Sequence, residues 1–276
     1  MSERSLTQEK KAEILVALDA SPHSLAALRA AVELASLLEA DLSSIFVEDV
    51  NLIRLCELPF TREIGSYSAT VRQIDSESIE REFRMLAAHI RKVVAQTADP
   101  ASVNWSFQVA RGSVTSELLA ASESAILLTL GRVGRTPGKR FGSTARTLAI
   151  QSKRPIFLLG DAGLVYPLSV VYSGSAAADR ALRLALVLTQ VQEKPLQIYT
   201  MPDLEQSGSV DELLQRCLES ATTDYEEKVI VIAMEGTDLL ATELESAPAG
   251  TLILPMEFAA LLEHYAHSAI LVPPDD

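Results

Sequence analysis

The chain of 276 residues is 48% hydrophobic, enough for one large core or two ordinary ones, and two domains are expected because domains usually run to about 100–150 residues. No stretch approaches the roughly 18 uninterrupted apolar residues of a membrane helix, and the polar start lacks the apolar block of a secretory signal, so a cytoplasmic protein without a membrane partner is expected. The two cysteines have no CxxC spacing, which excludes a disulfide framework and a cysteine-rich zinc site.

The net charge of −13 is unevenly distributed along the chain. Residues 1–162 hold 19 Lys and Arg against 19 Asp and Glu, whereas residues 163–276 hold 5 against 18 and therefore carry the whole net charge. A nucleic-acid surface needs clustered cations, so the acidic second half argues against a nucleic-acid partner. Solubility alone would account for its acidity.

Strands and helices alternate along the first half. An apolar run at residues 14–18 ends in a turn-rich tetrapeptide at 19–22, and apolar residues at helical spacing follow, which predicts strand, loop and helix. Further strands are predicted at 42–47, 103–110, 125–130 and 155–159, with helices at about 79–93, 115–122 and 144–151. Because these strands lack polar alternation, they predict a buried parallel sheet with helices on both faces and a ligand at the strands' C-terminal ends.

The second half repeats this scheme. Residues 21–31 align without gaps on residues 175–185, an offset of 154, and share a serine and an Ala-Leu-Arg-x-Ala core. A repeat of this length predicts duplicated domains, because solenoid units run to only about 20–50 residues. The expected fold is α/β, with two tandem doubly wound, mainly parallel five-stranded sheets. The expected domains are residues 1–161 and 162–276.

A glycine-rich basic segment follows the strand predicted at 125–130. Residues 124–160 hold seven Lys and Arg and no Asp or Glu, and the segment 131–144 reads GRVGRTPGKRFGST. Glycines let backbone N–H groups approach oxygens closely, and the start of the next helix offers further N–H donors, a pattern typical of a phosphate site. A basic loop that merely caps a helix with Ser143 or Thr144 would fit the same residues. The segment is not a Walker A motif, because Val133 stands where its first glycine belongs and Arg140 replaces Ser or Thr.

These features resemble the universal stress protein family, whose first strand ends in Asp and whose fourth leads into Gly-x2-Gly-x9-Gly-(Ser/Thr). The matching residues, within residues 12–160, are Asp19, Gly131, Gly134, Gly142 and Ser143. The resemblance implies a universal stress protein-like, adenine nucleotide alpha hydrolase-like fold that binds ATP or AMP, with or without Mg²⁺. It places the nucleotide site at Ala17, Leu18, Asp19, Val47, Leu130, Gly131, Val133, Gly134, Arg135, Gly142, Ser143 and Thr144.

Within that site, the resemblance implies that Asp19 contacts the nucleotide, that Val47 supplies a backbone partner for adenine, and that the glycine segment holds ribose and phosphates. The chain departs from the family pattern in one respect, because only seven residues separate Gly134 from Gly142. Pro137 and Gly138 could close this shorter turn. ATP and AMP both stay open as ligands.

The second half lacks these features. Ser173 stands where the first half has Asp19, and the strand predicted at 251–254 runs into Pro-Met-Glu-Phe instead of Gly-x2-Gly. The resemblance therefore implies a degenerate second domain that packs against the first within one chain, as two chains do in single-domain members. A homodimer of whole chains stays open.

Two classes of function fit this sequence. The first is a stress-response regulatory protein that binds an adenine nucleotide in its N-terminal domain, and the second is a scaffold that acts through protein contacts without nucleotide. An ATPase with Asp19 and Ser143 around Mg²⁺ is a third alternative, but no nucleophile triad, general base or metal-binding carboxylate pair is apparent, so no catalytic or metal residue is predicted and hydrolysis is at most slow. Residues 52–60 form an amphipathic stretch that could be a lid, a partner surface or ordinary packing.

Overall fold

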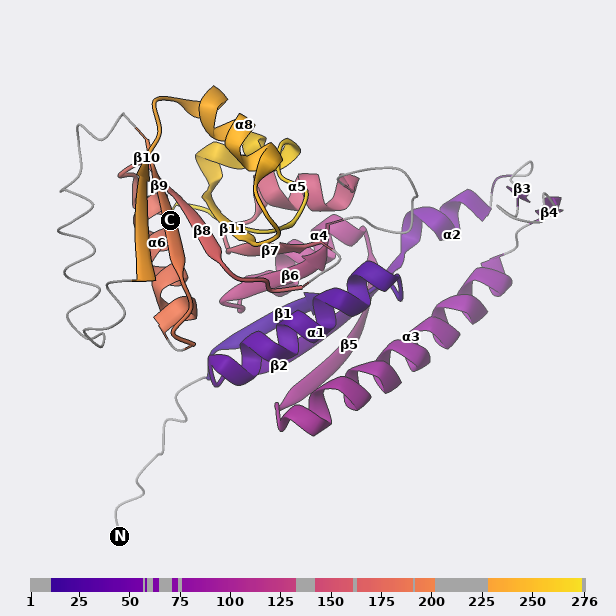
Figure 1. Cartoon of the computed structure of the whole chain (residues 1–276). Coiled ribbons are helices and arrows are strands. Elements are labelled where there is room, and N and C mark those ends of the chain that lie inside the picture. The colour runs from indigo at the N-terminus through magenta and orange to yellow at the C-terminus, as the bar shows by residue number, and fades with distance from the viewer. Residues whose placement is uncertain are drawn as a thin grey trace, which may run out of the picture.

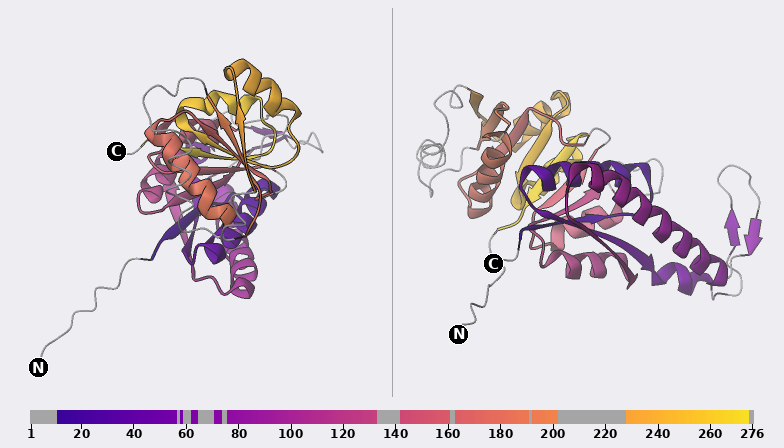
Figure 2. Two further views of the ribbon diagram at one scale, coloured as in Figure 1. Left: turned by 60° about the vertical axis from the view of Figure 1, so that its left-hand side comes forward. Right: turned by 90° about the horizontal axis from the view of Figure 1, so that it is seen from below.

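Ten strands form one twisted sheet in a computed structural model of the chain (Figures 1 and 2). The structure describes residues 11–56, 58, 62–64, 71–73, 76–132, 142–160, 163–190, 192–201 and 228–274. The N-terminal half of the sheet consists of β1 (Glu13–Ala17), β2 (Asp41–Asp49), β5 (Trp105–Gly112), β6 (Leu127–Gly131) and β7 (Ile156–Leu159). The C-terminal half consists of β8 (Leu168–Tyr172), β9 (Leu196–Thr200), β10 (Val229–Ala233), β11 (Thr251–Pro255) and β12 (Ser268–Val272).

Helices cover both faces of this sheet. They are α1 (Pro22–Leu37), α2 (Val50–Cys56), α3 (Ser76–Ala98), α4 (Val114–Ser122), α5 (Ser143–Gln151), α6 (Ala176–Gln190) and α8 (Thr237–Ser246), with 3-10 segments η1 (Asp99–Ala101) and η3 (Met256–Glu263). One core layer lies under α1, α3 and α6, and the other lies under α4, α5, α8 and η3. Both layers draw residues from both halves of the sheet, so the hydrophobic core is continuous along the chain.

The predicted α/β class and the mainly parallel sheet are confirmed, and every predicted strand of the first half is present within about two residues of its expected ends. The strand order is the same in the two halves, namely third, second, first, fourth and fifth. The sequence did not indicate how the two five-stranded units meet. They meet edge to edge, because β7 pairs antiparallel with β12, while the other described pairs in the ten-stranded sheet are parallel.

The aligned serines of the two halves start their helices in the same way. Ser21 accepts a hydrogen bond through Oγ from the N–H of Ser24 at 3.2 Å, and Ser175 accepts one from the N–H of Ala178 at 3.1 Å. The side-chain oxygen thereby satisfies one of the N–H groups that the first turn of a helix leaves without a partner. The 154-residue offset in the sequence thus relates positions with the same local geometry.

One part of the first half was not predicted from the sequence. Helix α2 follows β2 directly, and the short antiparallel strands β3 (Arg62–Ile64) and β4 (Val71–Gln73) come next. These elements and the start of α3 project away from the sheet (Figure 1). Helix α2 overlaps the amphipathic stretch at residues 52–60, but it is only seven residues long and buries none of them, so the stretch did not identify a helix. Among the described residues, no helix is both long and apolar enough to cross a membrane.

We expect the junction between β7 and β12 to contribute strongly to stability. Phe157 is fully buried and lies opposite Ile270 across that junction. Phe157→Ala should lower the free energy of unfolding by about 3–5 kcal/mol, because it removes a large buried side chain and leaves a cavity. Urea unfolding monitored by circular dichroism would measure the change.

The matched control is Ile150→Ala in α5, since Ile150 is 72% exposed and its truncation should change stability by no more than about 0.5 kcal/mol. Equal losses in the two variants would contradict the assigned importance of the junction.

Candidate functional site

The turn between β1 and α1 is fixed by local hydrogen bonds. Ala20 adopts a left-handed conformation with φ of 62°, and the N–H of Ser21 donates to Oδ1 of Asp19 at 2.9 Å. The N–H of Asp19 in turn donates to Oγ of Ser24 at 3.3 Å. Asp19 therefore has a structural role in the turn, but this role uses one oxygen of its carboxylate.

Strand β2 extends beyond the end of β1. The last register pair joins Ala17 to Ile45, and the N–H of Leu18 donates to the carbonyl of Ile45 at 2.9 Å. Backbone groups of residues two apart in a strand point to the same side, so the N–H and C=O of Val47 also point toward the β1 side. Because β1 has already ended there, these two groups face the space beside the β1–α1 turn.

Strand β6 and helix α5 form the opposite wall. Gly142 is the N-cap of α5, and its N–H donates to the carbonyl of Arg132 at 3.0 Å, which closes the base of the glycine-rich segment. The N–H groups of Ser143, Thr144 and Ala145 are those of a first helical turn, which have no partner within the helix. They carry the positive end of the helix dipole.

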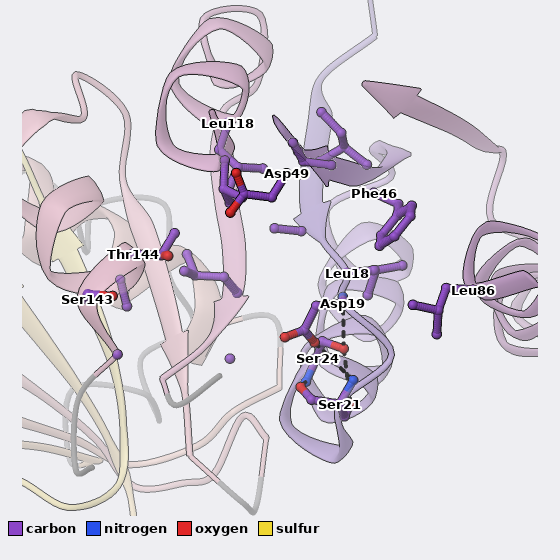
Figure 3. Close-up of a pocket in the computed structure, with 18 of the residues that line it drawn as sticks. Leu18, Asp19, Ser21, Ser24, Phe46, Asp49, Leu86, Leu118, Ser143 and Thr144 are labelled. Carbon is purple, nitrogen blue, oxygen red and sulfur yellow. Dashed lines mark hydrogen bonds between the residues drawn. The ribbon is translucent and has the colours of Figure 1, made fainter. Parts of the chain in front are cut away.

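These elements enclose a pocket of about 430 Å³ (Figure 3). That size lies within the range of about 300–1,000 Å³ that is usual for ligand sites. Nine of the twelve residues predicted for the nucleotide site line it: Ala17, Leu18, Asp19, Val47, Leu130, Gly131, Gly142, Ser143 and Thr144. The other three, Val133, Gly134 and Arg135, lie outside the described residues.

The pocket has a polar side and an apolar side. Figure 3 shows Ser143 and Thr144 on one side of Asp19, and Phe46 and Leu86 on the other. Asp19 and Asp49 are the two acidic residues of the lining, and its described part contains no Lys or Arg. Such a pocket suits a ligand with an apolar ring, hydroxyl groups and a terminal anion that meets backbone N–H groups.

Asp49 was missed in the sequence because it lies just beyond the strand predicted at 42–47. Its Oδ1 accepts hydrogen bonds from the backbone N–H and the Nδ2 of Asn51, both at 2.9 Å. The preceding residue, Glu48, is held by Arg111 of β5 at 2.7 Å, and Arg111 also contacts Glu80 of α3 at 3.1 Å. The hydrogen bond to Glu48 raises the pKa of Arg111. The end of β2 is thereby fastened to β5 and α3.

At least three of the seven cations of the basic segment interact with other parts of the protein. Arg132 donates to backbone carbonyls of the C-terminal half, Arg146 pairs with Glu263 at 2.5 Å, and Arg154 donates to the carbonyl of Glu123 at 2.7 Å. These three side chains are therefore held by protein groups. Three others, Arg135, Lys139 and Arg140, lie outside the described residues.

The corresponding place in the C-terminal half contains one of the protein's own carboxylates. Glu257 follows β11, and its Oε1 accepts hydrogen bonds from the hydroxyls of Ser173, at 2.9 Å, and Ser175. These serines lie in the β8–α6 turn, where the N-terminal half has Asp19 and Ser21. A side chain of this half therefore occupies the region that the pocket occupies in the other half.

The described residues place no group of three or more His, Cys, Asp or Glu side chains where it could hold a metal ion. Asp19, Asp49 and the hydroxyls of α5 offer hard oxygen ligands of the kind that Mg²⁺ takes.

Comparison with known proteins identifies the family. The model of the universal stress protein family matches residues 12–159, which is more than half of the chain, so the chain belongs to that family. No curated protein matches the chain.

Solved structures share the fold. A universal stress protein from Archaeoglobus fulgidus DSM 4304 is 17% identical with a TM-score of 0.67, over 96% of this chain and 97% of that one. A functionally unknown protein from Pseudomonas aeruginosa PAO1 is 11% identical with a TM-score of 0.57, over 96% of this chain and 94% of that one.

Gly131 is required for packing as well as for the pocket. A Cβ atom at this position would lie 2.8 Å from Cβ and 3.0 Å from the backbone carbonyl carbon of His23 in α1. Gly131→Ala should therefore lower the free energy of unfolding by about 1–3 kcal/mol through overpacking, so it cannot serve as a clean binding mutant. Thermal unfolding would measure the effect.

Gly236→Ala is the control, because a Cβ atom there would meet nothing within 4 Å. If Gly131→Ala were as stable as this control, the close approach of α1 to β6 would be refuted.

Proposed function

We propose that this protein is a stress-response regulator that binds one adenine nucleotide, ATP or AMP, in the pocket of its N-terminal half and acts in the cytoplasm. The observation that carries the proposal is the convergence of residues from separate segments on one pocket. These residues come from the ends of β1, β2 and β6 and from the start of α5, and they are those that the family pattern assigns to nucleotide.

In this proposal each wall of the pocket recognises one part of the nucleotide. The N–H and C=O of Val47 pair with the edge of adenine, and the carboxylate of Asp19 accepts hydrogen bonds from ribose hydroxyls. The first-turn N–H groups of α5 bind the phosphate, because a helix start combines free donors with a positive dipole end.

We propose further that the chain is a duplication, with domains at 1–161 and 162–276 that pair within one molecule. The repeated strand order and the equivalent helix starts at Ser21 and Ser175 support this view. The second domain does not bind nucleotide in this proposal, since Glu257 already satisfies the hydroxyls of its β8–α6 turn.

The role is regulatory in this proposal. The acidic residues of the described pocket, Asp19 and Asp49, each accept a backbone hydrogen bond through Oδ1 within their own turns, which supports a structural role for them over a role as general base. ATP hydrolysis is expected to be slow or absent. Turnover that disappeared in Asp19→Ala and persisted in a remote surface variant would favour the ATPase alternative.

Titration of the purified chain with ATP and with AMP under native mass spectrometry tests the proposal. We expect one nucleotide per chain, since Glu257 already accepts hydrogen bonds from the corresponding turn of the second half. Two nucleotides per chain would contradict the assignment of the second half. No binding at millimolar nucleotide would refute the proposal and favour the scaffold alternative.

Ser143→Asp tests where the phosphate binds. A carboxylate at the first residue of α5 favours the helix, because it complements the dipole, but it repels a phosphate on the same N–H groups. At an effective dielectric constant of about 20, two like charges a few ångströms apart repel each other by several kcal/mol. We therefore expect nucleotide affinity to fall by about tenfold or more. Isothermal titration calorimetry would measure it.

Thr237→Asp is the matched control, because it adds the same charge at the first residue of α8, in the other half. The Thr237→Asp protein should bind nucleotide with the affinity of the wild type. If Ser143→Asp also bound nucleotide with wild-type affinity, the phosphate would have to lie elsewhere.

A further inference from the structure

The start of the glycine-rich segment is fastened to the C-terminal half by Arg132. This residue directly follows Gly131 of the pocket wall, and its backbone N–H donates to the carbonyl of Leu159 at 2.8 Å. Its side chain is 5% exposed and leaves the N-terminal half. The guanidinium donates to the backbone carbonyl of His267 at 2.7 Å and to that of Leu262.

The end of the same segment is fastened to the same region. Helix α5 packs against η3, and Arg146 in α5 pairs with Glu263, the last residue of η3, at 2.5 Å. The two side chains are 61% and 66% exposed, so this ion pair is a weaker attachment than the buried guanidinium. The N–H of Gly142 donates to the carbonyl of Arg132, so the two attachments are also joined to each other.

The contacts of Arg132 therefore bear on the wall of the pocket that β6 and α5 form. A buried cation needs acceptors, and carbonyls of the C-terminal half supply them. Gly131 precedes Arg132 in the chain, and Gly142 is hydrogen-bonded to it, so a shift of Arg132 moves two residues of that wall. The guanidinium itself is directed to the other half of the molecule and is not among the residues that line the pocket.

We propose that Arg132 is a positioning residue for the N-terminal pocket, held by η3 and the residues after it, so that the C-terminal half sets the affinity of the N-terminal half for its ligand. This inference rests on the proposed function, in which that ligand is an adenine nucleotide. The coupling is reciprocal by thermodynamic necessity, so bound nucleotide strengthens the attachment of η3. Glu257 of η3 accepts hydrogen bonds from the β8–α6 turn, so bound nucleotide in the first half also affects that turn of the second half.

Arg132→Met tests this inference, because it keeps the apolar stem and removes the donors. If fewer molecules of the variant hold the pocket in the conformation that binds nucleotide, the apparent dissociation constant rises. We expect calorimetry to show an increase of about tenfold for both AMP and ATP. Arg154→Met is the matched control, since Arg154 also donates to a backbone carbonyl but does so within the N-terminal half. Wild-type affinity in a folded Arg132→Met protein would overturn the proposal.

Glu263→Ala provides a second test that does not threaten folding, because the side chain is exposed. Loss of its attachment to Arg146 should weaken nucleotide binding by about two- to fivefold, the range of an exposed ion pair. Removal of a negative charge near the pocket would by itself strengthen binding of an anion, so the sign of the change separates positioning from simple electrostatics. Glu193→Ala, which breaks the remote pair with Lys228, should leave affinity unchanged. Stronger or unchanged binding in Glu263→Ala would count against the proposal.

Hydrogen exchange on the nucleotide-free protein separates this inference from the proposed function. If Arg132 positions the segment, Arg132→Met should increase amide exchange across residues 142–151, whereas Arg154→Met should not. Should the wild-type protein bind no nucleotide, the proposed function fails, and increased exchange would still support the positioning role. Unchanged exchange across residues 142–151 would overturn that role whatever the wild-type protein binds.

Discussion

The antiparallel pairing of β7 with β12 is the contact on which the rest of the structure depends. Residues Ile156–Leu159 of β7 and the opposing residues of β12 are buried on both faces of the sheet. A strand of this kind left at an edge would expose unpaired N–H and C=O groups next to apolar side chains, which invites aggregation. Pairing within the chain removes both edges at once and turns two five-stranded units into one sheet.

This junction also explains why the pocket of one half is attached to the other half. Strand β6 lies next to β7, and η3 lies next to β12, so the pairing of β7 with β12 brings the end of β6 beside η3. The first half contributes a basic segment and the second half contributes carbonyls and the carboxylate of Glu263. Solubility therefore does not account for all of the acidity of residues 163–276, because at least Glu257 and Glu263 have specific partners.

The sequence predicted those features that depend on local pattern. Apolar runs such as residues 125–130 predicted the positions of the strands. The alignment of Ser21 with Ser175 predicted that the two halves repeat one fold. The resemblance to the universal stress protein family placed Asp19, Val47 and Gly142 in one expected site, and all three line the pocket. Features that depend on distant contacts were out of reach. Arg132 and Leu262 are 130 residues apart, so the sequence offered the arginine only as one more cation of a basic segment.

The two halves differ most in how they satisfy the groups around the corresponding turn. In the C-terminal half, the hydroxyls of Ser173 and Ser175 donate to the carboxylate of Glu257, so donors and acceptor belong to the same chain. In the N-terminal half, the turn carries the carboxylate of Asp19, and it faces the first turn of α5, whose N–H groups have no acceptor within their helix. Donors at a helix start favour an anion, and the described acidic residues of the pocket, Asp19 and Asp49, already accept hydrogen bonds within their own turns. The second half thus satisfies the hydroxyls of its turn with its own glutamate, whereas the corresponding turn of the first half borders a pocket.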